Sequence, residues 1–86
     1  MSVQNRRVDV TQHARTRWLQ RVAADDPYPG TSVREAFRES SHTDVGRRVR
    51  GYHQDLGVLF VAVKSDATTT IITVYESARS GREDNE

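Results

Sequence analysis

The hydrophobic period of the chain changes near residue 45, and this change constrains the fold more than any other feature. Before that point most apolar side chains recur every three or four residues, as on helices, whereas from Val45 onward they alternate, as on strands. A fold of helices alone or of strands alone is therefore excluded. The 86 residues allow one small core, so we expect one domain over 1–76.

The first half of the chain predicts a short strand and two helices. Residues 6–10 alternate polar and apolar side chains, as in a half-buried strand. Thr11 is a suitable N-cap for a helix that runs to about Ala24. After the turn-rich residues 27–30, Ser32 and Glu35 have the spacing of a capping box, which predicts a second helix that ends near residues 40–41.

The second half predicts three strands. The first, over 45–53, places Val45, Arg47, Val49, Gly51 and His53 on one face, and Gly46, Arg48, Arg50 and Tyr52 on the other. Residues 58–63 are continuously apolar, as in a central strand covered on both faces, and residues 68–75 follow as a third strand joined by a hairpin. The expected fold is α+β, with an N-terminal strand, two helices on one face of a three-stranded antiparallel sheet, and the other face partly open. Residues 77–86 are small, charged and aperiodic, so we expect a disordered tail.

Composition bears on the compartment and on the partners. The chain has no Cys, and its longest unbroken apolar run has six residues, far short of the roughly 20 of a membrane helix, so we expect a cytoplasmic protein without membrane contact. Residues 1–50 carry ten Arg against six acidic residues, whereas residues 51–86 carry three cations against six. This asymmetry favours a local basic patch over a strongly basic nucleic-acid binder.

Three side chains form a polar stripe on the first predicted helix. His13, Arg17 and Arg21 are four residues apart and lie beside the apolar stripe. A neutral imidazole in the first helical turn could accept a proton, and the two guanidinium groups could bind phosphate. The alternative is structural, with His13 tying the helix start to the neighbouring strand and the arginines pairing with acids such as Asp25.

A second basic group lies on the arginine-rich strand. Arg47, Arg48 and Arg50 are candidates for a phosphate platform, and Tyr52, His53 and Tyr75 could lie at the rim of the sheet beside it. The alternative is a solvated sheet edge guarded by charge, with His53 merely exposed beside a turn.

Several kinds of chemistry lack the residues that they need. The three His stand at positions 13, 42 and 53, so no two have metal-ligand spacing, and we expect no metal site. The five Gly form neither a P-loop nor a dinucleotide fingerprint, and no Ser has a nucleophile-elbow context. We therefore expect no cofactor.

The chain resembles an uncharacterised RelE-like domain family of the RelE/ParE toxin superfamily. The likeness lies in a His-Ala-x-x-Arg-x-x-x-Arg motif, which spans His13 to Arg21, and in an Ile-Thr-Val-Tyr strand over residues 72–75. It covers about residues 9–76. Members of the superfamily include ribonucleases that act on mRNA, with or without the ribosome, and gyrase inhibitors, commonly neutralised by a small antitoxin.

The resemblance implies a metal-independent ribonuclease and assigns roles to particular residues. It implies that His13 is a base or an orienting group and that Tyr75 is a late acid or a stacking group. It implies that Arg17, Arg21 and Arg47 bind phosphate, and that these five side chains converge in one concave site. The expected partners are RNA or the ribosome and a cognate antitoxin.

Two other readings remain open. One is a binding module without catalysis, such as a gyrase-directed toxin, a DNA-binding regulator or a protein of a mobile element that binds a protein partner. The other is a small structural homodimer, which requires the 68–75 strand to be an uncovered edge that pairs with its copy.

Overall fold

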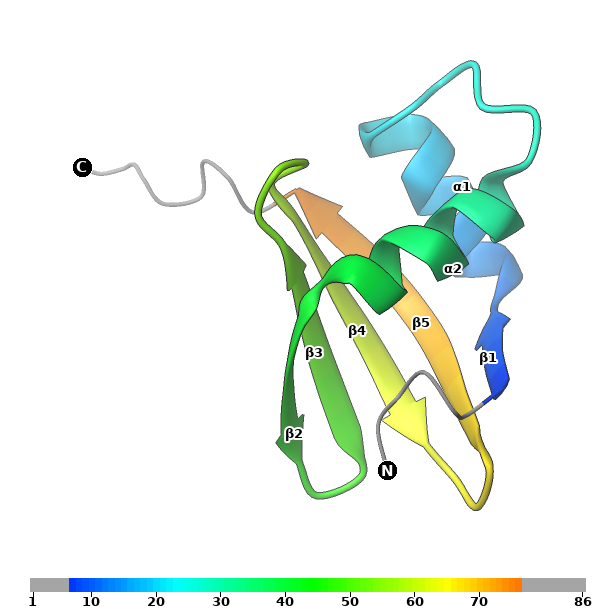
Figure 1. The fold of residues 1–86 in the computed structure, drawn as a ribbon. Helices are drawn as coiled ribbons and strands as arrows, with labels where there is room; N and C mark the ends of the chain where they lie inside the picture. The colour runs from blue at the N-terminus through cyan, green and yellow to red at the C-terminus, as the bar shows by residue number, and fades with distance from the viewer. Residues whose placement is uncertain (1–6, 77–86) are drawn as a thin grey trace.

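The protein folds into one sheet with two helices on one of its faces (Figure 1). This is a computed structural model, and it describes residues 7–76. The strands and helices follow one another as β1 (Arg7–Val10), α1 (Gln12–Arg21), α2 (Pro29–Glu39), β2 (Ser41–Val45), β3 (Arg48–His53), β4 (Val58–Lys64) and β5 (Thr68–Glu76). The expected α+β order, with an N-terminal strand before two helices, is confirmed. The expected tail at 77–86 lies outside the described residues.

The sheet has five strands in the order β1-β5-β4-β3-β2, not the three that we expected. β1 joins it by pairing parallel to β5, from Arg7 opposite Thr68 to Val10 opposite Ile71, whereas the other three pairings are antiparallel. β5 therefore lies between β1 and β4. The 68–75 strand is not the uncovered edge that the structural-homodimer reading requires.

The strand predicted over 45–53 is in fact the second half of a hairpin. Gly46 has a φ of 63°, in the left-handed region that glycine adopts without strain, and the chain reverses there between β2 and β3. Gly46 and Arg47 therefore belong to a turn and not to a strand. The predicted alternation holds for β3, where Arg48, Arg50 and Tyr52 are exposed and the residues between them are buried.

Helix α1 begins where it was predicted and ends three residues earlier. The Thr11 hydroxyl oxygen accepts a hydrogen bond from the Ala14 N–H at 3.1 Å and also lies 3.0 Å from the Ile71 carbonyl oxygen on β5. This one side chain caps the helix and ties its start to the sheet. The helix ends at Arg21, and the Trp18 indole N–H donates to the Asp26 carboxylate at 2.9 Å across the following loop.

Helix α2 begins at Pro29, so the predicted capping box is wrong. Ser32 lies inside the first turn, and the N-cap residue, Tyr28, makes no side-chain capping bond. Proline is well suited to the first helical position because its fixed φ is already helical and its missing N–H would have no acceptor there. The Ser32 hydroxyl bonds the Asp26 carboxylate instead.

The core lies between the two helices and one face of the sheet. Phe37 of α2 and Phe60 of β4 meet edge to face with ring centroids 5.9 Å apart, and Trp18 of α1 stacks 6.3 Å from Phe60. Gly51 lies beneath α2, where a Cβ atom would come within 3.2 Å of the Phe37 ring. The side chains of β4 that point away from the helices are half-buried, so the expectation that this strand is covered on both faces is wrong. No helix among residues 7–76 is long and apolar enough to cross a membrane.

Candidate nucleic-acid interface

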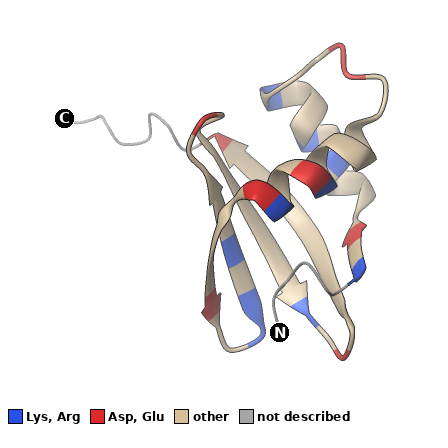
Figure 2. Cartoon of the chain, viewed as in Figure 1, with Lys and Arg blue, Asp and Glu red and all other residues tan. Residues whose placement is uncertain are grey.

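The face of the sheet opposite the helices presents cations and aromatic rings from neighbouring strands. On β3 the side chains of Arg48, Arg50 and Tyr52 point to this face, because Val49, Gly51 and His53 point to the core. On β5 Val74 is buried and pairs with the buried Phe60, whereas Tyr75 is exposed and pairs with Leu59. We call this surface the open face; Figure 2 shows the basic segments of β3 that contribute to it.

The register of the strands aligns the aromatic residues of the open face. Tyr52 pairs with Leu59 across β3 and β4, and Leu59 pairs with Tyr75 across β4 and β5. The two tyrosines are therefore two strand spacings apart, about 10 Å between their Cα atoms, with Leu59 between them. Their exposed fractions are 41% and 53%, which is high for rings that could have been buried.

The arginines of the open face occupy the next two rows. Arg50 pairs with Val61, which pairs with Thr73, and Arg48 pairs with Val63. Neither of these arginines makes an ion pair with the acidic residues of the described part of the chain. The open face therefore combines exposed rings, a half-buried aliphatic strip and two cations that form no ion pair with the described carboxylates.

The basic stripe of α1, formed by His13, Arg17 and Arg21, lies beside the C-terminal half of β5. Pairing between β1 and β5 stops at Val10 and Ile71, and α1 follows directly and packs along β5. His13 and Arg21 are exposed and Arg17 is half-buried. His13 and Arg21 are about 12 Å apart along the helix axis, with Arg17 midway between them.

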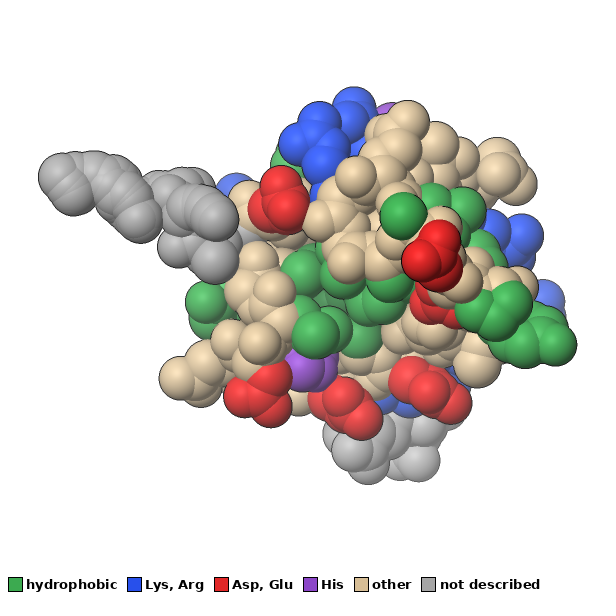
Figure 3. All heavy atoms as spheres, turned by 90° about the horizontal axis from the view of Figure 1, so that it is seen from above, with side chains coloured by type: hydrophobic (Ala, Val, Ile, Leu, Met, Phe, Trp, Pro, Cys, Tyr) green, Lys and Arg blue, Asp and Glu red, His purple; other side chains and the backbone are tan. Residues whose placement is uncertain are grey.

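Arg21 and the end of β5 line one hollow of about 330 Å³, whose other walls are formed by the turn between β3 and β4. Glu76 and Asp55 contribute acidic groups there, and Leu56, which is 47% exposed, contributes an apolar one. Seen from above, apolar side chains line the hollowed centre of the molecule, and one group of basic side chains stands at its upper rim (Figure 3).

Arg47 lies away from the other predicted site residues. It belongs to the turn between β2 and β3 and lines a separate hollow with Lys64, Ser65 and Asp66. Tyr75 is at the opposite end of the sheet, in the row of Tyr52, which lies about 16 Å along the strands from Arg47. The five side chains that the resemblance assigns to one concave site are therefore not gathered around one point.

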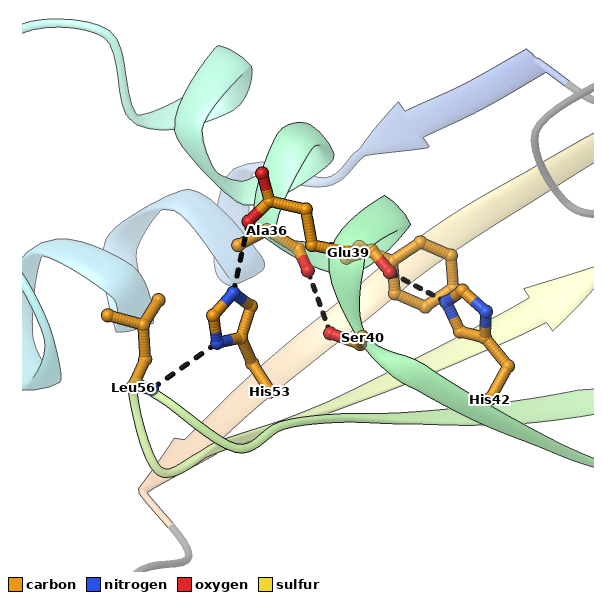
Figure 4. Close-up of polar contacts among 7 residues, drawn as sticks. Ala36, Glu39, Ser40, His42, His53 and Leu56 are labelled. Atoms are coloured by element: carbon orange, nitrogen blue, oxygen red, sulfur yellow. Dashed lines mark hydrogen bonds and ion pairs between the residues drawn. The ribbon is translucent and has the colours of Figure 1, made fainter.

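His53 lies on the core side of the sheet, on the face opposite Arg48 and Arg50. It is 8% exposed; its Nδ1 accepts a hydrogen bond from the Leu56 N–H at 3.3 Å, and its Nε2 lies 3.1 Å from the Glu39 carboxylate (Figure 4). Because Nδ1 accepts, Nε2 carries the proton and donates to Glu39. Both ring nitrogens thus join the turn between β3 and β4 to the end of α2.

His42 is also held by α2. Its Nε2 donates to the Phe37 carbonyl oxygen at 2.6 Å, and its ring lies 4.5 Å from the Phe37 ring (Figure 4). Residues 7–76 contain no group of three or more His, Asp or Glu side chains that could hold a metal ion.

Sequence reasoning missed two groups of residues. The continuous apolar run places Leu59 in the core, but its half-buried side chain lies between the two tyrosines of the open face. Only the strand register reveals this. Arg15 and Arg34 were not considered, although they line a hollow between the helices. No local sequence pattern marks either arginine, because their approach depends on the packing of α1 against α2.

Comparison with protein families gives one result. The family model described as "Putative RelE superfamily toxin domain" matches residues 10–78, which include both helices and strands β2 to β5. Neither the search of curated proteins nor the search of solved structures found a match. The resemblance of the His13 to Arg21 motif to RelE-like domains is thereby confirmed. Since the match spans most of its 86 residues, the chain belongs to the RelE superfamily of toxin domains.

Proposed function

We propose that this toxin domain binds single-stranded RNA on the open face of its sheet. The observation that carries the proposal is the row Tyr52, Leu59 and Tyr75, in which two exposed rings flank an aliphatic side chain in register. Unpaired bases stack on such rings, and the bases of a duplex do not, because they already stack on one another.

The arginines supply the other half of the interaction. Arg48 and Arg50 lie on the same face and on the same strand as Tyr52, so a strand whose bases stack on the rings has its phosphates within reach of the guanidinium groups. Arginine binds phosphate with two parallel N–H donors, and these two arginines have no acidic partner among the described residues.

We further propose that bound RNA is cleaved without a metal ion. Tyr75 is the tyrosine of the row that lies on β5, the strand in contact with α1, and its phenol can donate a proton to a departing 5'-oxygen. Arg17 and Arg21 on α1 carry charge to stabilise a phosphorane. His13 is the proposed base for the ribose 2'-hydroxyl. The 2'-hydroxyl attacks the adjacent phosphate, so the base and the phosphate-binding cations must act within one nucleotide step. Arg17, one helical turn from His13, is the nearer of the two arginines.

Fluorescence anisotropy with a labelled RNA tests the binding step. The protein should bind a single strand more tightly than a duplex of the same sequence, and salt should weaken the complex. Equal affinity for the duplex would contradict stacking on Tyr52 and Tyr75.

A cleavage time course tests the chemical step. Purified protein is incubated with RNA in EDTA, with and without ribosomes, and compared with His13→Ala, Arg17→Ala and Tyr75→Phe. The expected result is EDTA-resistant cleavage that all three substitutions reduce by about 100-fold or more. Arg38→Gln is the matched control, because Arg38 is an exposed cation of α2 outside the proposed site. Absence of cleavage in both settings would overturn the ribonuclease proposal and leave the binding proposal standing.

The hollow at the end of α1 favours a second candidate function, the binding of a protein partner. Its lining combines the exposed apolar Leu56 with the acidic Asp55 and Glu76 and the basic Arg21. This composition suits a peptide with both apolar and charged groups. Leu56→Asp should abolish binding of a purified cognate antitoxin and leave RNA affinity unchanged. Unchanged antitoxin binding by this variant would contradict this candidate.

A further inference from the structure

A hollow between the two helices is built from arginines that the proposed RNA site does not use. Its volume is about 240 Å³, and its lining residues are Arg15, Tyr28, Pro29, Gly30, Thr31 and Arg34. Arg15 comes from α1 and Arg34 from α2, so the hollow lies in the helical layer. Among residues 7–76, no acidic side chain lines it.

The guanidinium group of Arg15 lies against the backbone of Gly30. A Cβ atom on Gly30 would be 3.1 Å from Arg15 Nε and 3.4 Å from Nη2, so the absence of a side chain gives the arginine its room. Nε is buried and has no hydrogen-bond partner within residues 7–76. A cation that has lost part of its hydration without gaining an acceptor is stabilised by an anion at its remaining N–H groups.

Arg34 is held beside the same hollow by the first strand. Its Nε donates to the Val8 carbonyl oxygen at 2.9 Å, which fixes the direction of the side chain. A guanidinium group has four further N–H donors on its two Nη atoms. The hollow is thus lined by two guanidinium groups, and a main-chain acceptor holds one of them in place.

The start of α2 adds backbone donors to the hollow. The N-cap Tyr28 makes no side-chain capping bond, and the first turn contains no acidic residue. Gly30 and Thr31 follow the proline, and the first N–H groups of an α-helix have no acceptor within the helix. The nearest acid in sequence, Asp26, accepts hydrogen bonds from the Trp18 indole, the Tyr28 N–H and the Ser32 hydroxyl, and it does not line the hollow.

We propose that this hollow binds the phosphate group of a nucleoside monophosphate. Two guanidinium groups and the start of a helix suit a dianionic phosphate monoester. The Tyr28 ring lines the same hollow and is 71% exposed, which places an aromatic surface where the base of a nucleotide would lie. The Arg15 and Arg34 site is separate from the open face and does not depend on the RNA proposal.

Amide chemical shifts measured by two-dimensional NMR test the site. Adenosine monophosphate should shift the Gly30 and Thr31 amide signals saturably, inorganic phosphate should do so with lower affinity, and adenosine should not. Arg15→Gln and Arg34→Gln should each weaken nucleotide binding by about tenfold or more. The control Arg38→Gln, farther along the same helix, should bind as the wild type does.

A variant that stays folded separates ligand binding from a purely structural role of the arginines. Thr31→Glu places a carboxylate in the first turn, where the helix dipole favours it, and the same carboxylate occupies the anion site. The variant should be at least as stable as the wild type and should not bind the nucleotide. Wild-type binding by Thr31→Glu, or no saturable shift with the nucleotide, would overturn the site. Equal affinity for phosphate and nucleotide would overturn the role of Tyr28.

Discussion

Tyr52 and Tyr75 lie on the two strands that flank β4, and both pair in register with Leu59. They are far apart in the sequence and reach the same face because each strand alternates its side chains. The shared register joins β3, the arginine-rich strand, to β5. Residues that are far apart in the sequence therefore form one continuous surface.

We expect substitution of either tyrosine to weaken RNA binding and leave the fold intact. Stacking on an aromatic side chain contributes about 1 to 3 kcal/mol per base, so Tyr52→Ala and Tyr75→Ala should each weaken affinity by that amount. Tyr52→Phe and Tyr75→Phe keep the ring and should bind RNA as the wild type does. Anisotropy titrations with one oligonucleotide measure all four variants, and equal losses for Phe and Ala would contradict stacking.

We expect His53 to contribute to stability and not to RNA binding. His53→Ala leaves the Leu56 N–H without its acceptor and opens a space in a buried position, which should lower the free energy of unfolding by roughly 1 to 3 kcal/mol. His13→Ala, at an exposed position, should change it by less than about 0.5 kcal/mol. Urea unfolding measures both. Weaker RNA binding by folded His53→Ala would contradict this prediction and place His53 in the interface.

The contribution of Asp26 to stability should depend on pH. Hydrogen bonds from the Ser32 side chain, the Tyr28 N–H and the Trp18 indole lower the pKa of this carboxyl group below its usual value of 3.8. A carboxyl group whose pKa is lower in the folded state stabilises the fold fully above its unfolded-state pKa, and this contribution is lost as the pH falls through the folded-state pKa.

Asp26→Asn should therefore melt at a lower temperature than the wild type at pH 6, and the difference should shrink below about pH 3.8. Asp25→Asn changes the neighbouring exposed acid and serves as the control. Thermal melts of the three proteins across this range provide the comparison, and a difference between wild type and Asp26→Asn that does not change with pH would contradict this account of the loop.

Gly46 should tolerate substitution only at a conformational cost. Its φ of 63° disfavours residues with a Cβ atom, although nothing lies within 4 Å of the place where that atom would be. Gly46→Ala should therefore lower the free energy of unfolding by about 1 kcal/mol. Gly46→Asn should cost less, because asparagine enters the left-handed region more readily. Equal losses for the two variants would point to a cause other than backbone conformation.

Local sequence patterns predicted most of the helices and strands. They failed where strands pair over long sequence separations, and where two signals for a turn or a helix start compete. The alternation of Arg48, Arg50 and Tyr52 was correct because side-chain period alone determines it. The reversal at Gly46 was missed because one glycine inside an alternating run fits a strand as well as a turn. At α2 a capping-box spacing at Ser32 competed with Pro29 at the first helical position, and the proline determined the start.

The sheet and the interface needed information that local patterns do not contain. The pairing of β1 with β5 joins residues about 60 positions apart, and no period in either segment specifies the other. The same holds for the row of Tyr52, Leu59 and Tyr75, which depends on two strand registers and on the register shift between Val61 and Ala62. The prediction that the arginines and Tyr75 belong to one nucleic-acid site stays a prediction.

The salt dependence of RNA affinity tests most directly whether the open face binds the RNA backbone. Kd for a single-stranded RNA is measured over a series of salt concentrations for the wild type, Arg48→Gln/Arg50→Gln and the control Arg38→Gln. If both arginines bind phosphates, the double variant should bind more weakly, and the slope of log Kd against log salt should fall by about 1.4, or roughly 0.7 for each lost contact. A double variant with wild-type affinity and slope would contradict the open face as the RNA-binding surface.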